Sequence, residues 1–217
     1  MHLTKLFFAT TALAVVAVAQ NPITADSRFQ VRYASNLTVG DSVINITNTG
    51  ANGASLFGPG FGGAAGNICV NVYAFAPDEQ LISCCSCLVT PDGLVSLSVV
   101  NDLISNTLTG VRPSSVVVKL ISTLAGTGGS GTSCTNSAAN AITTANLVGG
   151  LAAWGTTIHA SPTGFATTET AFTPSTLSAG ELASVANRCT NIIGNGTGFG
   201  ICNSCRAGGL GAGRSAN

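Results

Sequence analysis

The eight cysteines are the side chains of this 217-residue chain with the clearest capacity for chemistry. An even number of cysteines in an exported chain predicts structural disulfides, which form in oxidising compartments. We therefore expect all eight to be cross-linked: Cys69, Cys84, Cys85, Cys87, Cys134, Cys189, Cys202 and Cys205. In an extended segment, the neighbours Cys84 and Cys85 point to opposite faces, so they are expected to bond to different partners.

Two spaced cysteine pairs also have the separation that metal and redox sites use. Cys84-x-x-Cys87 and Cys202-x-x-Cys205 could together bind zinc, because four thiolates form a tetrahedral site. A Cys-x-x-Cys dithiol within a βαβ unit would instead indicate redox chemistry. The pairs lie far apart in the sequence, neither sits in a βαβ pattern, and export disfavours thiolate sites. Structural disulfides are the favoured interpretation, and we expect no metal ion and no cofactor.

Acid–base chemistry has few candidate residues. His159 is the one histidine after the predicted leader, and no Gly-x-Ser-x-Gly elbow accompanies it, so a serine hydrolase is not indicated. The carboxylates of Asp78 and Glu79 follow a predicted strand, where they could serve a glycosidase or be a solvated strand end. An enzyme built on Asp78, Glu79 and His159 is our third functional hypothesis, and no catalytic residue is assigned.

Lys119 is the one lysine after the leader, and it lies among valines in a predicted strand. It could form an intramolecular isopeptide bond with an asparagine. The interpretation we favour is that its charge keeps a sticky β-strand from pairing with other chains.

Three aromatic residues could stack against a sugar. Trp154, Tyr33 and Tyr73 have the amphipathic rings that carbohydrate platforms use. Aromatic residues scattered along a chain are more often core residues, and that is the interpretation favoured here.

The first 19 residues have the pattern of a secretory signal peptide. Lys5 supplies the positive charge, residues 6–19 are apolar, and Ala17-Val18-Ala19 fits the small-x-small cleavage rule. The apolar run is shorter than the roughly 20 residues of a membrane span, so we expect cleavage after Ala19 and no span in the mature chain. The predicted location is secreted, extracellular or at the cell surface, with the periplasm as an alternative.

Charged residues make up only 7% of the chain, and its formal net charge is zero. Ordinary soluble domains have about 25% charged residues. Nucleic-acid binding needs a basic stripe to neutralise phosphates, so no nucleic acid is expected as a partner. A weakly charged surface repels other copies poorly. The composition fits an ordinary neutral secreted domain or a subunit that packs against further copies of itself.

Alternating residues predict a mainly β fold. In residues 68–75, Ile68, Val70, Val72 and Ala74 would share one face. Further strands are expected at residues 29–33, 42–47, 115–124, 153–160 and 166–172. Residues 48–66 are rich in Gly, Ala and Asn and predict a long surface loop.

One helix is predicted, over residues 179–193. Ser178 and Glu181 form a capping box, in which the serine oxygen accepts a backbone N–H and the glutamate reaches back. Apolar residues then recur at helical spacing until Gly194 ends the helix. Residues 100–108 could form a second, short helix.

Cys189 lies on the apolar face of the predicted helix. A disulfide from it to Cys202 or Cys205 would clamp the C-terminal segment to the helix. Residues 207–217 are rich in glycine and predict a flexible tail. Between leader and tail, residues 20–206 are expected to form a single β-rich, disulfide-braced domain, with two lobes as the alternative.

Residues 78–87 (Asp-Glu-Gln-Leu-Ile-Ser-Cys-Cys-Ser-Cys) precede residues 101–109 (Asn-Asp-Leu-Ile-Ser-Asn-Thr-Leu-Thr). Together with residues 154–160 and the Cys-Asn-Ser-Cys at 202–205, they resemble uncharacterised exported cysteine-containing proteins of acidobacterial type. The resemblance covers most of the mature chain and implies a bacterial origin, but the group carries no known activity.

The predicted fold is a disulfide-stapled, β-sandwich-like domain with one C-terminal helix packed across it. The leading functional hypothesis is a secreted extracellular structural protein, a homopolymer that forms surface filaments. Residues 20–36 could be an N-terminal arm that adds a strand to the next copy, or simply the first strand of the same sheet. The alternative function is a carbohydrate- or surface-binding module that contacts cell-surface glycans through loops such as residues 48–66.

Overall fold

The computed structural model describes residues 28–57, 65–203 and 205–207. The predicted signal peptide, residues 20–27 of the predicted arm and residues 208–217 of the predicted tail lie outside the described residues. Within the described part of the chain, no helix is both long and apolar enough to cross a membrane.

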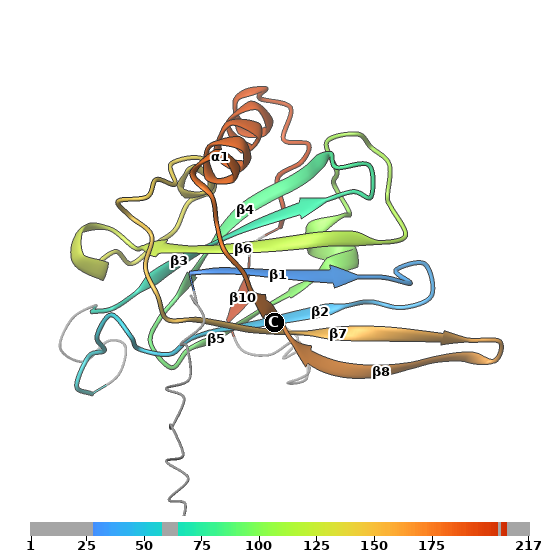
Figure 1. Ribbon diagram of the computed structural model, residues 1–217, viewed down its shortest axis with the longest axis horizontal. Coiled ribbons are helices and arrows are strands. Elements are labelled where there is room, and N and C mark those ends of the chain that lie inside the picture. The colour runs from blue at the N-terminus through green and yellow to red at the C-terminus, as the bar shows by residue number, and fades with distance from the viewer. Residues whose placement is uncertain (1–27, 58–64, 204, 208–217) are drawn as a thin grey trace, which may run out of the picture.

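The described residues form two antiparallel five-stranded sheets, which confirms the predicted mainly β fold (Figure 1). Sheet A has the strand order β4 (Leu81–Val89), β3 (Ile68–Phe75), β6 (Val116–Leu124), β1 (Phe29–Ala34) and β9 (Thr173–Pro174). Sheet B has the order β10 (Arg206–Ala207), β5 (Leu94–Ser98), β2 (Val43–Asn48), β7 (Leu151–Ser161) and β8 (Gly164–Ala171). The six segments predicted as strands correspond to β1, β2, β3, β6, β7 and β8.

The two sheets pack around a shared apolar core, so the domain is sandwich-like. Burial alternates along β2, where Ile44 and Ile46 are fully buried. Val72 of β3 and Leu120 of β6 belong to the same apolar cluster and come from the facing sheet. Each fully buried aliphatic side chain of this kind stabilises the fold by about 1.5–3 kcal/mol.

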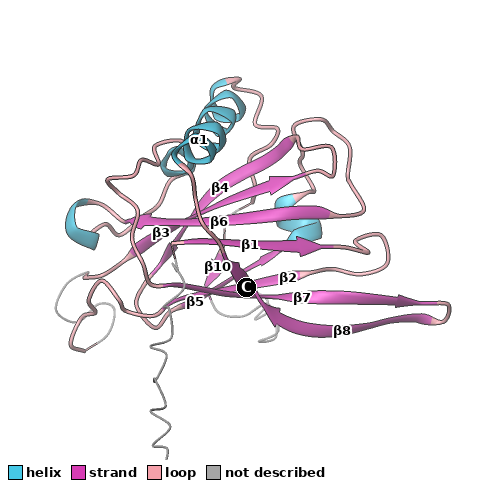
Figure 2. Ribbon diagram, viewed as in Figure 1, coloured by secondary structure: helices cyan, strands magenta, loops and turns pink. Residues whose placement is uncertain are grey.

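Part of the outer face of sheet A is covered by the one α-helix among the described residues, α1 (Ala179–Gly194), and Ala139 and Ile142 pack in the same apolar cluster. α1 lies beside the strands at the β4 end of sheet A (Figure 2). Its buried face carries Leu182, Val185 and Ile192, which pack with Tyr73 and Ile121 of the sheet. Because helix and core cover opposite faces of β3, every residue of that strand is buried. The predicted helix is confirmed.

Half of the predicted capping box is present. The Ser178 hydroxyl accepts a hydrogen bond from the backbone N–H of Glu181 at 3.1 Å. The Glu181 carboxylate does not reach back to the cap. It pairs with Lys119 of β6 instead, because α1 lies across that strand.

Other local expectations differ from the structure. The short helix expected at residues 100–108 is a single π-helical turn at Val99–Leu103, called η1, followed by irregular backbone. β4 was not among the predicted strands, because both of its faces are buried and it has no apolar–polar alternation. Two short 3-10 turns, η2 (Thr127–Gly129) and η3 (Asn136–Ala139), complete the described elements.

All eight cysteines are paired, as predicted. The disulfides join Cys69 to Cys134, Cys84 to Cys189, Cys85 to Cys202 and Cys87 to Cys205. Cys84 and Cys85 do have different partners. The expectation that Cys189 bonds to Cys202 or Cys205 is wrong, because Cys84 faces α1 on the outer side of sheet A.

The segment after α1 runs from one sheet to the other. Ile201 forms an isolated bridge with Cys84 at the edge of sheet A. Residues 206 and 207 then pair with β5 at the edge of sheet B, as β10. Ala207, the first residue of the predicted tail, thus belongs to a strand.

We predict that the disulfide between Cys84 and Cys189 is a major source of stability. The double variant Cys84→Ala/Cys189→Ala should lower the free energy of unfolding by about 3 kcal/mol, because the neighbouring disulfide between Cys85 and Cys202 stays intact and this bridge then closes a loop of about 15 residues. Denaturant unfolding of the exported protein measures the loss. The variant Cys69→Ala/Cys134→Ala opens a loop of 65 positions that no neighbouring disulfide closes and should lose slightly more, about 4 kcal/mol. A loss below about 1 kcal/mol for the first variant would contradict the prediction.

Candidate functional site

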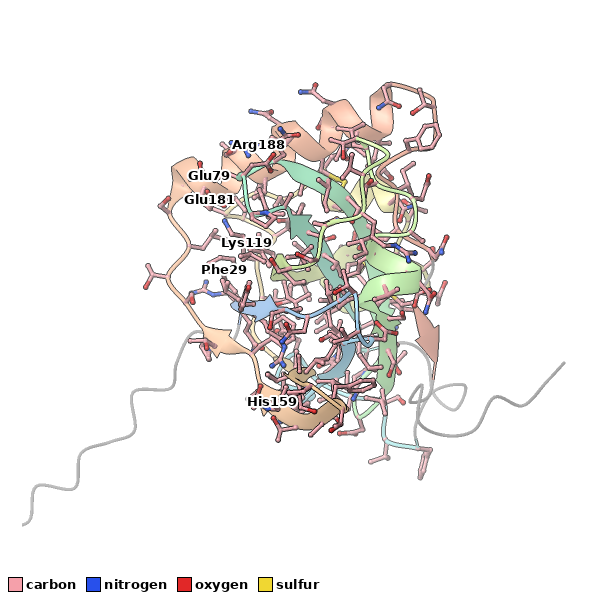
Figure 3. All side chains as sticks on the ribbon, turned by 90° about the vertical axis from the view of Figure 1, so that its right-hand side faces the viewer. Phe29, Glu79, Lys119, His159, Glu181 and Arg188 are labelled. Carbon is pink, nitrogen blue, oxygen red and sulfur yellow. A yellow bond between two sulfur atoms is a disulfide. The ribbon has the colours of Figure 1, made fainter. Side chains whose placement is uncertain are left out.

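Four charged residues gather where α1 crosses the outer face of sheet A. Glu79 lies in the turn between β3 and β4, Lys119 lies on β6, and Glu181 and Arg188 lie on α1 (Figure 3). In a chain with only 7% charged residues, this is a marked concentration of charge. We call this set, together with the ring of Phe75, the charged cluster.

Both cations of the cluster lie near the Phe75 ring, and one of them is paired with a carboxylate. Lys119 Nζ lies 2.5 Å from Glu181 Oε1 and 4.6 Å from the ring centroid. Arg188 donates from Nη1 to the backbone carbonyl of Glu79 at 2.8 Å, and its guanidinium carbon lies 5.9 Å from the same centroid. Cation–π contacts of this kind contribute about 0.5–1 kcal/mol each at exposed sites.

A depression of about 270 Å³ opens at the cluster. Its apolar lining comes from Phe75, Ala76, Pro77 and Val117, and charged groups surround it. The volume is at the lower end of the range for small-molecule sites, so one compact group such as a sugar ring or an amino acid would fill it. Among the described residues, no three histidine, cysteine, aspartate or glutamate side chains come close enough to hold a metal ion.

The three residues of the enzyme hypothesis do not meet. Glu79 contributes to the depression, whereas Asp78 accepts a turn hydrogen bond from the N–H of Gln80 at 3.4 Å. His159 lies on β7 at the other end of the molecule, far from Glu79 (Figure 3). Its Nε2 is 2.9 Å from the Thr168 hydroxyl of β8.

The aromatic residues do not form a shared platform. Tyr73 is fully buried and donates its hydroxyl hydrogen bond to the carbonyl of Ala139 at 2.6 Å. Tyr33 is 61% exposed on sheet A, and Trp154 is 39% exposed on sheet B. Their neighbours Ala34 and Ala153 point into the core between the sheets, so the two rings lie on opposite outer faces.

Neither interpretation of Lys119 matches its surroundings. Its partner is the carboxylate of Glu181 and not an asparagine. β6 lies between β3 and β1, so the charge does not protect a sheet edge. The sequence placed the lysine in the correct strand but did not show that α1 would cross it.

Arg32 is a structurally important residue that the sequence analysis missed. It is buried on β1 and donates from Nη1 to the Thr170 carbonyl at 2.8 Å and from Nη2 to the Thr157 hydroxyl at 2.7 Å. Burial lowers the pKa of Arg32, and the nearby carboxylate of Glu169 opposes that shift. A side chain at Gly155 would lie 2.4 Å from Arg32 Nε, so the glycine makes room for the arginine. Arg32 thereby fixes the β7–β8 hairpin to sheet A.

Comparisons with protein-family models, with curated proteins and with solved structures found no match to this chain. The resemblance to exported proteins of acidobacterial type therefore stays a prediction.

Tyr73 predicts a loss of stability at alkaline pH. Burial raises the pKa of its hydroxyl above the ordinary value, so above about pH 10 only the unfolded chain loses this proton. The group should lower the free energy of unfolding by about 1.4 kcal/mol per pH unit there. Denaturant unfolding at several pH values should show a smaller alkaline loss in Tyr73→Phe and an unchanged loss in Tyr33→Phe. Equal slopes for Tyr73→Phe and the unaltered protein would contradict this prediction.

Proposed function

We propose that the chain is a secreted, extracellular structural protein, and that copies of it assemble into surface filaments. The observation that carries the proposal is the cross-linking of β4, which bonds to α1 through Cys84 and to the C-terminal segment through Cys85 and Cys87. Disulfides of this kind persist outside the cytoplasm and resist unfolding. They favour a body that lasts outside the cell.

The surface chemistry supports association between copies. The formal net charge is zero and few side chains are charged, so electrostatic repulsion between copies is weak. Within the charged cluster, Lys119 pairs with Glu181, and Arg188 bonds to the backbone carbonyl of Glu79. β8 is exposed along its whole length and offers a sheet edge to which a further strand can add.

Strand exchange at the N-terminus is the mode of filament growth that we propose. Residues 29–34 of the predicted arm form β1 and pair with β6 of the same chain, which is the ordinary-first-strand arrangement. On its other side β1 pairs with β9 at only Gln30 and Val31. A β1 from a neighbouring copy could therefore make the same six pairs with β6 in a swapped assembly.

Electron microscopy of the exported protein at high concentration tests the proposal, with filaments as the expected result. The variant Tyr33→Cys/Val117→Cys tests the exchange, because these residues lie opposite each other in the β1–β6 register. If β1 pairs with β6 of a neighbouring copy, the new disulfide should join copies into a ladder on a non-reducing gel. Filaments whose subunits run as monomers on that gel would exclude the exchange, and a protein that stays monomeric at every concentration would exclude the filament.

The charged cluster supports a second candidate, a carbohydrate- or surface-binding module. Its depression combines an aromatic ring, a cation and carboxylates, which are groups that bind sugar hydroxyls. Glycan-array binding without filament formation would favour this function. The double variant Lys119→Met/Glu181→Gln should then lose binding, whereas Arg112→Gln, at an exposed residue that does not line the depression, should retain it. Equal binding by both variants would place the glycan elsewhere.

A further inference from the structure

Among the residues that the structure describes, β8 is an open edge of sheet B. It pairs with β7 over eight residue pairs without a register shift, and all of its eight residues are exposed. The hairpin that the two strands form extends beyond the other strands at one end of the molecule (Figure 1). Half of the backbone N–H and C=O groups of β8 therefore point towards solvent, where only another extended strand can pair with them all.

The other sheet edges are covered or short. The β4 edge is bonded to the C-terminal segment, with the N–H of Cys84 donating to the Gly200 carbonyl at 2.8 Å. The side chain of Asn136 accepts from the N–H of Ser86 on the same edge. β9 and β10 have only two residues each, and β9 ends in Pro174, which has no N–H to donate. Among the described strands, β8 is the long edge strand that no such covering segment or proline protects.

β8 also lacks the residues that usually keep an edge from pairing. Native edge strands carry lysine, proline or a bulge. β8 reads Gly-Phe-Ala-Thr-Thr-Glu-Thr-Ala, and its one charge, Glu169, already accepts a hydrogen bond from the Asn45 side chain at 2.9 Å. The strand is thus a threonine-rich edge with a single charge and high β propensity.

The edge is held in one conformation before any partner arrives. Arg32 bonds to the Thr170 carbonyl and to the Thr157 hydroxyl, which ties both strands of the hairpin to sheet A. His159 bonds to the hydroxyl of Thr168 across the hairpin. A fixed strand loses little conformational entropy when it pairs, so a weak contact is enough to form a complex.

We infer that β8 pairs antiparallel with β8 of a second copy of this chain, about a twofold axis at Thr168. The inference rests on the proposed function as a structural subunit and names one contact between subunits. It joins the two copies of sheet B into one continuous sheet. Because a twofold contact is closed, it makes dimers on its own and cross-links filaments that grow through another surface.

The register follows from the side chains. A continuous sheet with a perpendicular twofold axis places one residue of β8 opposite its own copy. The Thr168-centred register places Phe165 opposite Ala171. It also places Thr167 opposite Glu169, so that the hydroxyl can donate to the carboxylate. A Glu169-centred register opposes two like charges, and a Thr167-centred register puts Phe165 against Glu169.

Two lysine substitutions at adjacent positions test the register, because they should act in opposite directions. Thr168→Lys places like charges opposite each other at the axis and should weaken the dimer roughly fivefold or more. Thr167→Lys places each lysine opposite a Glu169 and should tighten the dimer roughly threefold. Sedimentation velocity of the exported protein over a range of concentrations measures both. Ala183→Lys, on the exposed face of α1, is the control and should behave as the unaltered protein.

A mixing experiment provides the second arm. Thr168→Glu alone should dissociate as Thr168→Lys does, and an equimolar mixture of the two should dimerise again through opposite charges at the axis. Dimerisation of the single variants as in the unaltered protein, or no recovery on mixing, would overturn the inference. Electron microscopy separates the two proposals. If the protein forms filaments and the variants at positions 167 and 168 have no effect on association, the structural function stands and the β8 contact is excluded. An unaltered protein that never dimerises would overturn the inference as well.

Discussion

The covalent attachment of β4 to the end of the chain is the constraint on which the rest of the structure depends. Cys84, on the outer face, holds α1 against sheet A, whereas Cys85 and Cys87 hold the segment that continues to β10 in sheet B. One strand thus connects the helix, one sheet and the edge of the other. Hydrophobic packing fills the space between these elements, but the cross-links decide which elements face each other.

The placement of α1 explains where the few charges of the molecule gather. The helix covers only part of the outer face of sheet A, and β6 carries Lys119 into the uncovered part beside Phe75. A half-buried ammonium needs a nearby acceptor, and the first turn of α1 supplies Glu181. Glu181 thereby joins the helix to the sheet through its ion pair with Lys119, and it does not cap the N-terminus of α1.

Much of the fold could be read from local patterns, and the tertiary pairings could not. Period-two alternation gave β2 and β3 nearly to the residue, and the cap at Ser178 gave the start of α1. β4 was not predicted as a strand, because both of its faces are buried and its residues do not alternate between apolar and polar. The partner of Cys189 and the ion pair of Lys119 both depend on α1 lying across sheet A. No spacing within the sequence shows that α1 crosses sheet A. The sequence analysis therefore noted Glu79, Lys119 and Glu181 one by one, and it grouped Glu79 with His159, which lies elsewhere.

The order in which a ribosome delivers the chain gives the disulfide map a further meaning. The three cysteines of β4 leave the ribosome more than 100 positions before their partners at 189, 202 and 205. Until then their nearest available thiols are one another, and a bond among these neighbours would block the correct partners. Correct oxidation must therefore wait, or its errors must be reversed, until the segment that carries residues 189–205 is present. This late segment thus decides whether β4 acquires its native cross-links.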